Sequence, residues 1–544
     1  MTPALKAGMA KEGISRGWLR FGLGCFVSAW ILWQVGWQPA HIFNATRFIL
    51  YDQGSYLYAI ERLNHGEMLY RDLHWQYGPL AAGWYWGWAQ LGGNSPLVLV
   101  LVSSALMAGA WWLLADLTLE VIGKRAGIIW ALLGLLPAMS PSGLIALNGP
   151  HGALEMLLLA ACAWLLAKFP ERNRRAWLLG FTLGALHWVR FGPGVVAFLA
   201  LLVLEGWRLR SDVLTWRAGI AALGGWLLRV LSAYVLSWLP LLVFYYARLP
   251  WSGVFEQLWP GHMVAHYAAT YSSRWPEWPG VRGLLITWLP VLCGLAGLLA
   301  WFSSGKGRNK VEAYPVRPAA LCGLVFGPLY WVFGNLMLFR NDYAMVGHLW
   351  LVWPGLAVCW ALAGRRLRLG LVALMVPALG ANLLGVKAVW QEEQTWQAAP
   401  MRLPNGQRLW FRPGEARRFA ELGEVLNRAL SGEKLAVFIA GGGVHYFYGT
   451  QRVGRHWWYL PEFVRPWEAV EAERALLRHH NLFVADFGQN AAANGSSGVL
   501  PLWLPLPADM GLRLLPRLTD ASYIDGLGHM MRIRPSVNHA PPPN

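Results

Sequence analysis

The stretch from Tyr51 to Leu80 gathers acidic, aromatic and glycine residues in a spacing that suits chemistry on a hydroxyl group. It contains three clusters: Tyr51-Asp-Gln-Gly-Ser-Tyr-Leu-Tyr58, Asn64-His-Gly-Glu-Met-Leu-Tyr-Arg-Asp72 and Gln76-Tyr-Gly-Pro-Leu80. Asp52 follows a first long apolar run, which predicts a position at the level of lipid headgroups. A carboxylate at that level can accept a proton from an incoming hydroxyl, so Asp52 is a candidate general base.

A helix is expected between the first two clusters, over residues 56–63. One face of this helix would be apolar, formed by Tyr56, Leu57, Ile60 and Leu63. Glu61 and Arg62 would fall elsewhere on its surface. This pattern predicts a helix that lies on the membrane surface.

The composition of the whole chain indicates a membrane environment for these clusters. Of 544 residues, 56% are hydrophobic and only 14% are charged, which excludes an ordinary soluble enzyme and a disordered tail. The 35 Trp residues suit membrane interfaces and contact with membrane lipids. The formal charge of +17 resides largely in loops, as described next, so we expect no nucleic-acid partner.

The apolar runs predict an α-helical polytopic membrane protein, since a span needs about 20 apolar residues. We count eleven candidate spans, centred near residues 28, 108, 135, 160, 183, 200, 236, 292, 328, 355 and 380. The first run, Gly22 to Trp37, has no small-residue cleavage site after it. We therefore expect it to remain as a signal anchor.

Alternate loops carry most of the Lys and Arg residues. They include Lys124-Arg125, a cluster from Lys168 to Arg175, and further clusters near residues 208–217, 306–317 and 365–368. The opposite connections are nearly free of Lys and Arg. The positive-inside rule then predicts a cytoplasmic N-terminus, and eleven spans place the C-terminus on the periplasmic or extracellular side. A bacterial inner membrane is the expected location.

The hydrophilic segments define the expected domains. Residues 1–390 form the transmembrane domain, with a first outer loop at 38–94 that carries the candidate active site. Residues 391–544 form a small α/β domain outside the cytoplasm, with strands over Leu435–Ala440 and Leu482–Asp486 and a helix over Pro466–His480. The Gly441-Gly-Gly443 run after the first strand lacks the G-x-G-x-x-G spacing of a nucleotide site, which favours a plain turn.

The first outer loop resembles that of the glycosyltransferase C superfamily. The resemblance is to the dolichyl-phosphate-mannose protein mannosyltransferases and the bacterial aminoarabinose transferases. It rests on the pattern D-x-x-x-Y, G-x-x-x-Y-x-D and G-P-L, here Asp52, Tyr56, Gly66, Tyr70, Asp72 and Gly78-Pro79-Leu80. Two further stretches, Leu179 to Pro193 and Arg340 to Pro354, are similar to a glycine-rich span and to an Arg-Tyr-apolar-Pro segment of that family.

The resemblance implies an inverting transfer of a hexose or pentose from a polyprenyl-phosphate-sugar donor. The acceptor would be a lipid, glycan or protein on the outer side. Asp52 would act as base, as the base carboxylate does in inverting glycosidases. Binding roles are expected for Tyr56 and Asp72 in the loop and for three residues at outer ends of spans that can stabilise phosphate: Arg190, Arg340 and His348.

Glu155 is the last residue expected in the site, and the sequence also bears on whether the site binds a metal ion. Glu155 lies one turn after His151 at the start of a span, where it can orient a site residue or pair locally. No cofactor is implied with certainty. Many relatives carry two adjacent acidic residues where this chain has Asp52-Gln53, so a divalent metal is possible but no motif supports one.

Two other classes of function stay open from the sequence. A secondary transporter also has many spans with a few charged residues inside, but it commonly shows two related halves, and no internal repeat is visible here. A lipid-linked-oligosaccharide ligase ordinarily carries its large loop late in the chain. The large loop of this chain comes directly after the first span.

Overall fold

The computed structural model describes the helical middle of the chain, its first outer loop and parts of its tail. The described residues are 42–50, 52–75, 77–122, 149–169, 171–212, 215–249, 318–337, 351, 399–412, 414–429, 435–438, 442–452, 454–455, 482–486, 518–524 and 528–533. They belong to two compact units. One comprises 1–38, 101–244 and 271–392, and the other comprises 39–100, 245–270 and 393–544.

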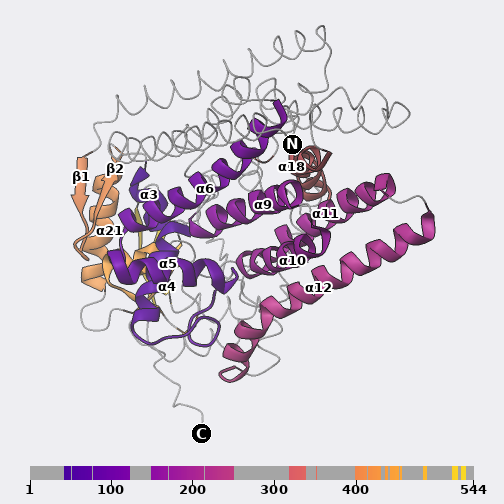
Figure 1. Cartoon of the computed structure of the whole chain (residues 1–544). Coiled ribbons are helices and arrows are strands. Elements are labelled where there is room, and N and C mark those ends of the chain that lie inside the picture. The colour runs from indigo at the N-terminus through magenta and orange to yellow at the C-terminus, as the bar shows by residue number, and fades with distance from the viewer. Residues whose placement is uncertain are drawn as a thin grey trace. The chain divides into compact units, whose positions relative to one another are not determined.

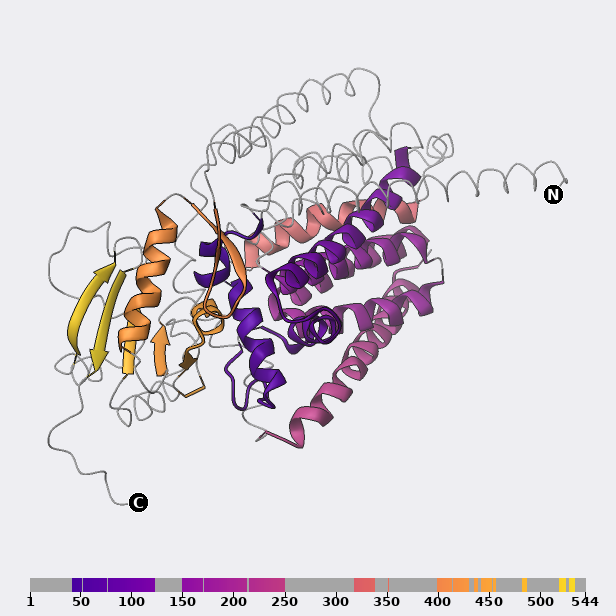
Figure 2. The same cartoon turned by 90° about the vertical axis from the view of Figure 1, so that its left-hand side faces the viewer.

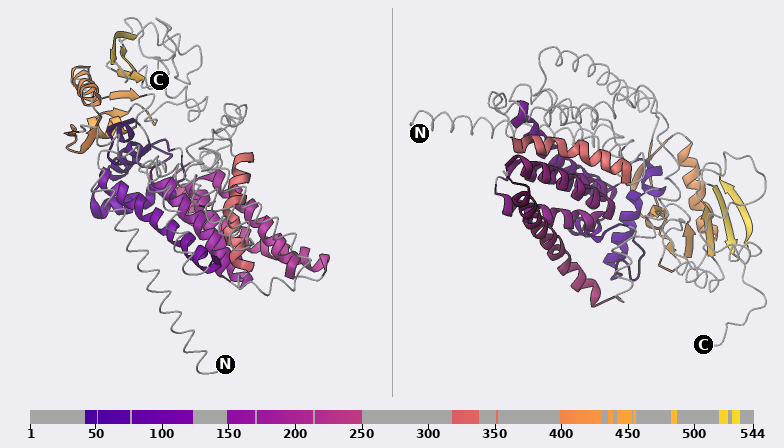
Figure 3. Two further views of the ribbon diagram at one scale, coloured as in Figure 1. Left: turned by 90° about the horizontal axis from the view of Figure 1, so that it is seen from above. Right: turned by 90° about the vertical axis from the view of Figure 1, so that its right-hand side faces the viewer.

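The first unit is built from helices. Helices α9 (Pro150–Lys168), α10 (Arg172–Val189), α11 (Phe191–Asp212) and α18 (Pro318–Met337) pack side by side, with α9 against both α10 and α18 (Figure 1). Helix α12 (Trp216–Tyr246) lies along α10, where the hydroxyl of Tyr234 is 2.8 Å from Nδ1 of His187. Figure 3 shows the same bundle from two further directions.

Four described helices are long and apolar enough to cross a membrane, so the chain is an integral membrane protein. They cover Pro96–Leu119 within α6 (Pro96–Ile122), Pro150–Lys168, Gly192–Leu209 and Trp216–Tyr246. They confirm the spans predicted near residues 108, 160, 200 and 236. Helix α10 covers the predicted centre at 183, and α18 contains a shorter apolar segment, Val325–Gly334, at the centre near 328. The other five predicted centres lie outside the described residues.

One local expectation for this unit needs correction. Arg172 to Arg175 were assigned to a cytoplasmic loop, but they form the first turn of α10, where Arg175 is buried against Glu205. At the other end of α10, the extended backbone of Arg190 separates α10 from α11. Pro193 fits inside the first turn of α11 because helix N-terminal N–H groups have no partner within the helix.

The second unit combines the first outer loop with the tail. The loop contributes α3 (Ala45–Leu50), α4 (Asp52–Asn64) and α5 (Pro79–Gly92). The tail contributes the hairpin β1 (Ala399–Arg402) and β2 (Arg408–Phe411), helices α21 (Glu415–Ala429) and α22 (Gly443–Tyr448), and a five-stranded sheet of order β4-β3-β5-β7-β6. Figure 2 shows α21 beside the hairpin of the last two strands.

The sheet confirms both predicted strands of the tail. β3 (Leu435–Phe438) and β5 (Leu482–Asp486) pair in parallel. β4 (Gln451–Arg452) pairs in parallel with β3, whereas β7 (Gly528–Ile533) is antiparallel to β5 and to β6 (Leu518–Ile524). The helix predicted over 466–480 lies outside the described residues, and a separate domain at 391–544 stays a prediction.

The predicted loop helix is present as α4, but its surroundings differ from the expectation. All residues from Gln53 to Ile60 are buried within the second unit. The apolar face therefore packs on protein instead of lying on a lipid surface. Neighbouring α3 and α22 supply this packing.

Candidate active site

Asp52 begins α4 and is held by an aromatic cluster. The hydroxyl of Tyr77 donates a hydrogen bond to Oδ2 of Asp52 at 3.1 Å. The ring of Tyr77 stacks on Tyr56, with ring centroids 6.4 Å apart and planes at 9°. Trp75 meets Tyr56 edge-on at 4.9 Å. The half-buried carboxylate of Asp52 thus has a fixed neutral partner on one side.

Tyr70 holds Tyr77 from behind. Its hydroxyl donates to the carbonyl of Tyr77 at 2.6 Å, and burial raises the pKa of this hydroxyl well above its usual value. Tyr70 has a positive φ of 71°, a conformation that bulky residues rarely adopt. A strained backbone persists only where its surroundings enforce it, and such positions cluster at functional sites. Tyr56, Tyr70 and Asp52, which the loop motif links only in sequence, therefore meet around Tyr77.

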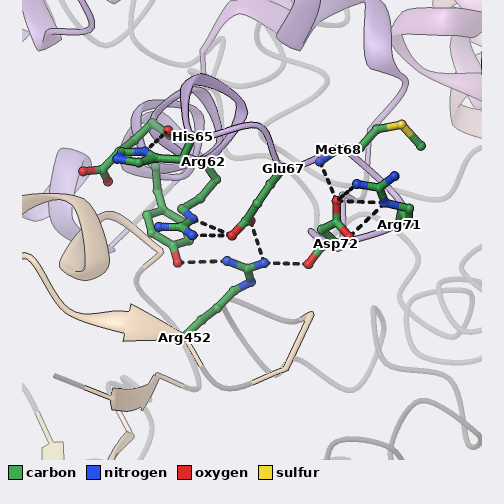
Figure 4. Close-up of polar contacts among 9 residues, drawn as sticks. Arg62, His65, Glu67, Met68, Arg71, Asp72 and Arg452 are labelled. Carbon is green, nitrogen blue, oxygen red and sulfur yellow. Dashed lines mark hydrogen bonds and ion pairs between the residues drawn. The ribbon is translucent and has the colours of Figure 1, made fainter. Parts of the chain in front are cut away.

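Asp72 takes part in the contacts that hold the loop at residues 67–72 closed, which we call the loop frame. Its carboxylate accepts the backbone N–H of Met68 at 2.9 Å and pairs with Arg71 (Figure 4). The hydrogen bond from Arg71 lowers the pKa of Asp72, against a smaller opposing effect of burial. Such contacts close the loop over residues 68–72 and keep the carboxylate ionised.

Glu67 and Arg452 form a second polar group beside this loop. Glu67 accepts hydrogen bonds from Arg62 of α4 and from Nη2 of Arg452 of β4, the latter at 2.7 Å. Burial would raise the pKa of Glu67, but the hydrogen bonds and charges of the two guanidinium groups outweigh burial and lower it. Figure 4 shows Arg452 between Glu67 and the backbone of Asp72.

A different cluster lies in the first unit around Glu155. Nη1 of Arg190 is 3.8 Å from Oε2 of Glu155, and the hydroxyl of Tyr330 in α18 donates to Oε1 at 3.5 Å. The side chain of Glu155 is only 2% exposed, whereas that of Arg190 is 35% exposed. His151, also buried, lies one turn before Glu155 on α9. Glu155 thus pairs with Arg190, as one of its two expected roles requires.

The predicted site residues that the structure describes lie in both units. Asp52, Tyr56 and Asp72 lie in the second unit, and Glu155 and Arg190 lie in the first. Arg340 and His348 lie outside the described residues.

Sequence reasoning missed Tyr77, Tyr330 and Arg452. Tyr77 stands directly before the Gly-Pro-Leu motif, which is a signal that could have singled it out. Tyr330 is one aromatic residue of an apolar span, and Arg452 is 385 positions from Glu67 in the chain. Only the folded chain reveals those two partners.

The donor set near Asp52 gives no positive support for a metal. Gln53, directly after Asp52, carries a neutral amide, and its side chain is buried. Within the described ranges, no group of three or more His, Cys, Asp or Glu residues is arranged to hold an ion.

No family model and no curated protein matches this sequence. Among solved structures, the chain is similar to ArnT from Cupriavidus metallidurans bound to undecaprenyl phosphate, with 12% identity and a TM-score of 0.47 over 93% of this chain and 98% of that one. It is also similar to an oligosaccharyltransferase from Archaeoglobus fulgidus in the apo form, with 11% identity and a TM-score of 0.48 over 86% of this chain and 69% of that one.

A further similar structure is the archaeal oligosaccharyltransferase AglB from Archaeoglobus fulgidus in complex with an inhibitory peptide and a dolichol-phosphate. It aligns with 12% identity and a TM-score of 0.47 over 97% of this chain and 75% of that one.

Proposed function

We propose that this chain is an inverting membrane glycosyltransferase that moves a sugar from a polyprenyl-phosphate-sugar donor to an acceptor hydroxyl on the outer side of the membrane. The observation that carries the proposal is the setting of Asp52. A half-buried carboxylate opens a helix, receives a hydrogen bond from Tyr77, and stands among the aromatic residues of the loop motif. Aromatic rings of this kind also suit contact with a sugar face.

In the proposed reaction, Asp52 accepts the proton of the acceptor hydroxyl as its oxygen bonds to the anomeric carbon. The bond from that carbon to the donor phosphate breaks on the opposite face, and polyprenyl phosphate leaves. This geometry inverts the anomeric configuration. A phosphate is already a good leaving group, so cationic stabilisation matters more to it than protonation.

Arg190 is the proposed ligand of the donor phosphate. A guanidinium carries five N–H donors in a planar fork, so it can hold Glu155 and a phosphate together. Glu155, buried and joined to Tyr330, would orient that fork. Arg340 and His348 remain proposed further contacts, on the strength of their predicted positions.

Purified protein in lipid vesicles tests the proposal directly. A panel of polyprenyl-phosphate hexoses and pentoses is offered with lipid, glycan and peptide acceptors, and products are identified by mass spectrometry. We expect an acceptor that gains one sugar with inverted configuration, together with free polyprenyl phosphate. Movement of a solute across the vesicle membrane without any transfer would favour a transporter, and transfer of a preassembled oligosaccharide would favour the ligase alternative.

The outer location of the reaction is a separate element of the proposal. It rests on the alternating loop charges, which predict an outer first loop and an outer C-terminus. A reporter that is active only outside the cytoplasm, fused after Asn544, should be active. A fusion that works only in the cytoplasm would reverse the topology and move Asp52 to the inner side.

A further inference from the structure

A short segment of the tail, Gly442 to Arg455, reaches onto the first outer loop. Helix α22 packs so closely on α4 that glycine is needed on both sides. A Cβ placed on Gly54 would lie 2.5 Å from the Cα of Gly443, and one on Gly443 would lie 1.9 Å from the carbonyl oxygen of Phe48. Gly443, the last residue of the glycine run expected to form a plain turn, therefore also provides a packing surface for α4.

Arg452 makes the most specific contact of this segment. Its Nη2 donates to Oε2 of Glu67 at 2.7 Å and to the carbonyl oxygen of Asp72 at 2.6 Å, and its Nη1 is 3.4 Å from the hydroxyl of Tyr58. The side chain is only 9% exposed. One guanidinium thus joins the middle of α4 to both ends of the loop at residues 67–72, as Figure 4 shows.

Other contacts of the segment surround the same loop. The ring of His445 stacks on Tyr58 with centroids 4.9 Å apart. The backbone N–H of His74 donates to the carbonyl of Arg455 at 2.9 Å, and Nη1 of Arg455 is 3.4 Å from the carbonyl oxygen of Tyr70. Helix α4 and the strained turn at Tyr70 are therefore both fixed from the tail.

From these contacts, we propose that Arg452 is a positioning residue, through which the tail segment 442–455 holds α4 and the loop at 65–74 in the arrangement that places Asp52. The inference deepens the proposed function, on which its catalytic part rests. Asp52 is the first residue of α4, and Tyr58 and Arg62 lie further along the same helix. Movement of the helix would shift Asp52 with it, and small misplacements of a catalytic group can cost large factors in rate.

The chemistry of the contact requires arginine. Three oxygen acceptors from separate parts of the chain receive hydrogen bonds from one planar fork, and lysine would offer a point charge in its place. Removing the guanidinium takes this donor from the Asp72 carbonyl. Glu67 then keeps its hydrogen bond from Arg62 but loses the one from Arg452. The loop should then open locally more often while the rest of the unit stays folded.

The test compares Arg452→Gln with Arg417→Gln in the full-length protein. Arg417 is exposed on α21, so the second variant makes the same chemical change outside the contact. Hydrogen–deuterium exchange is measured on peptides that cover residues 57–74. We expect about tenfold faster exchange there in Arg452→Gln and no change in Arg417→Gln. This readout needs no substrate, so it reports on the contact independently of the proposed function.

Kinetics then test the positioning role. In Arg452→Gln, we expect kcat per folded molecule to fall about tenfold while KM for the donor stays within twofold, because Arg452 touches neither reacting group. Arg452→Lys should recover part of the loss. Unchanged exchange at 57–74 would overturn the contact, and faster exchange with unchanged kcat would overturn its link to catalysis.

Two further measurements keep the outcome clear. Faster exchange in a protein whose wild type transfers no sugar supports the contact and refutes the proposed function. If Arg452→Gln fails to fold, Glu67→Gln removes the charge of its partner and should accelerate the same peptides. The double variant should lose no more than about the larger single loss, because both changes remove one contact, whereas independent effects would multiply.

Discussion

Two of the acidic residues that the sequence singled out, Asp52 and Glu155, have opposite surroundings. Asp52 is half-buried and receives a hydrogen bond from the neutral Tyr77, whereas Glu155 is almost fully buried and faces the guanidinium of Arg190. A carboxylate with a neutral partner and some exposure keeps the capacity to accept a proton from a substrate. A buried carboxylate opposite a cation is better suited to fix that cation, since the carboxylate without it would be an unpaired buried charge.

The different surroundings of Asp52 and Glu155 suit two different tasks, proton transfer and phosphate binding. Under the proposed function, a carboxylate with the surroundings of Asp52 would accept the proton, and a guanidinium with those of Arg190 would bind the departing phosphate. Arg175 and Glu205 give a useful contrast inside the helical unit. They form a pair with both N–O distances at 3.1 Å, and both side chains are only 1% exposed, so no substrate can reach the guanidinium. Arg190, at 35% exposed, is accessible.

Replacing Asp52 should produce the largest effect on transfer. Asp52→Asn keeps the size of the side chain and removes the proton acceptor, so transfer should fall by about 10²-fold or more. Asp72→Asn is the matched control within the same loop, and it should cost far less because Asp72 serves the loop frame through Met68 and Arg71. Initial rates are measured at saturating donor, with thermal stability in detergent as a check on folding. Near-normal turnover in a folded Asp52→Asn protein would end its assignment as base.

Replacing Arg190 should produce the second-largest effect, and this effect should appear in the use of the donor. Arg190→Ala should reduce kcat/KM for the donor by at least about tenfold, and Arg190→Lys by less, because lysine keeps the charge and loses the fork. Glu205→Gln is the control, since it disrupts a buried ion pair of the same unit that substrate does not reach. It should lower thermal stability and leave donor dependence unchanged. Full activity of Arg190→Lys, with only a stability loss in Arg190→Ala, would mean that the side chain merely anchors the span.

A substitution of Tyr77 tests the surroundings of Asp52 with a smaller chemical change. Tyr77→Phe removes the hydrogen bond to Asp52 and keeps the ring that stacks on Tyr56. We expect transfer to fall by roughly tenfold, the lower end of the effect of one hydrogen bond to an ionised group. Tyr85→Phe removes a comparable hydrogen bond to Asn94 in the same unit and should leave the rate unchanged. Equal losses in the two variants would show a general effect on folding instead of one on Asp52.

The features that the sequence predicted correctly are those that depend on local patterns of residues. Apolar runs predicted four spans that the structure describes, and the continuous apolar runs at 435 and 482 predicted β3 and β5. The loop motif picked out Asp52 and Tyr70. Periodicity also predicted α4, but it could not tell whether an apolar face meets lipid or protein, because both environments favour the same residues.

The unpredictable part depends on contacts between distant segments. Nothing in the sequence around Arg452 indicates that it meets Glu67, and the Gly441-Gly-Gly443 run has no signature of close helix packing. Tyr330 likewise becomes a partner of Glu155 only when α18 packs on α9. Side chains of this kind are recognised when the fold brings their acceptors within reach.

The smallest effect we predict is on stability, and its pH dependence distinguishes the loop frame from the catalytic carboxylate. The pKa of Glu67 is lowered in the folded chain, because the hydrogen bonds and charges of Arg62 and Arg452 outweigh the opposing effect of burial. A carboxyl with a lowered folded pKa stabilises the fold above its unfolded pKa, about 4.5, and the contribution is lost as the pH falls through the folded value.

The difference in Tm between wild type and Glu67→Gln should therefore be constant at a few degrees from pH 8 to about pH 5, shrink below that, and disappear in stronger acid. Glu421→Gln, at an exposed position of α21, serves as the control and should give a Tm difference near zero throughout. Because both variants remove one carboxyl, their comparison cancels the general effect of net charge. A Tm difference for Glu67→Gln that persists unchanged in acid would mean that shape, and not the ionised contact with Arg62 and Arg452, is what Glu67 contributes to the loop.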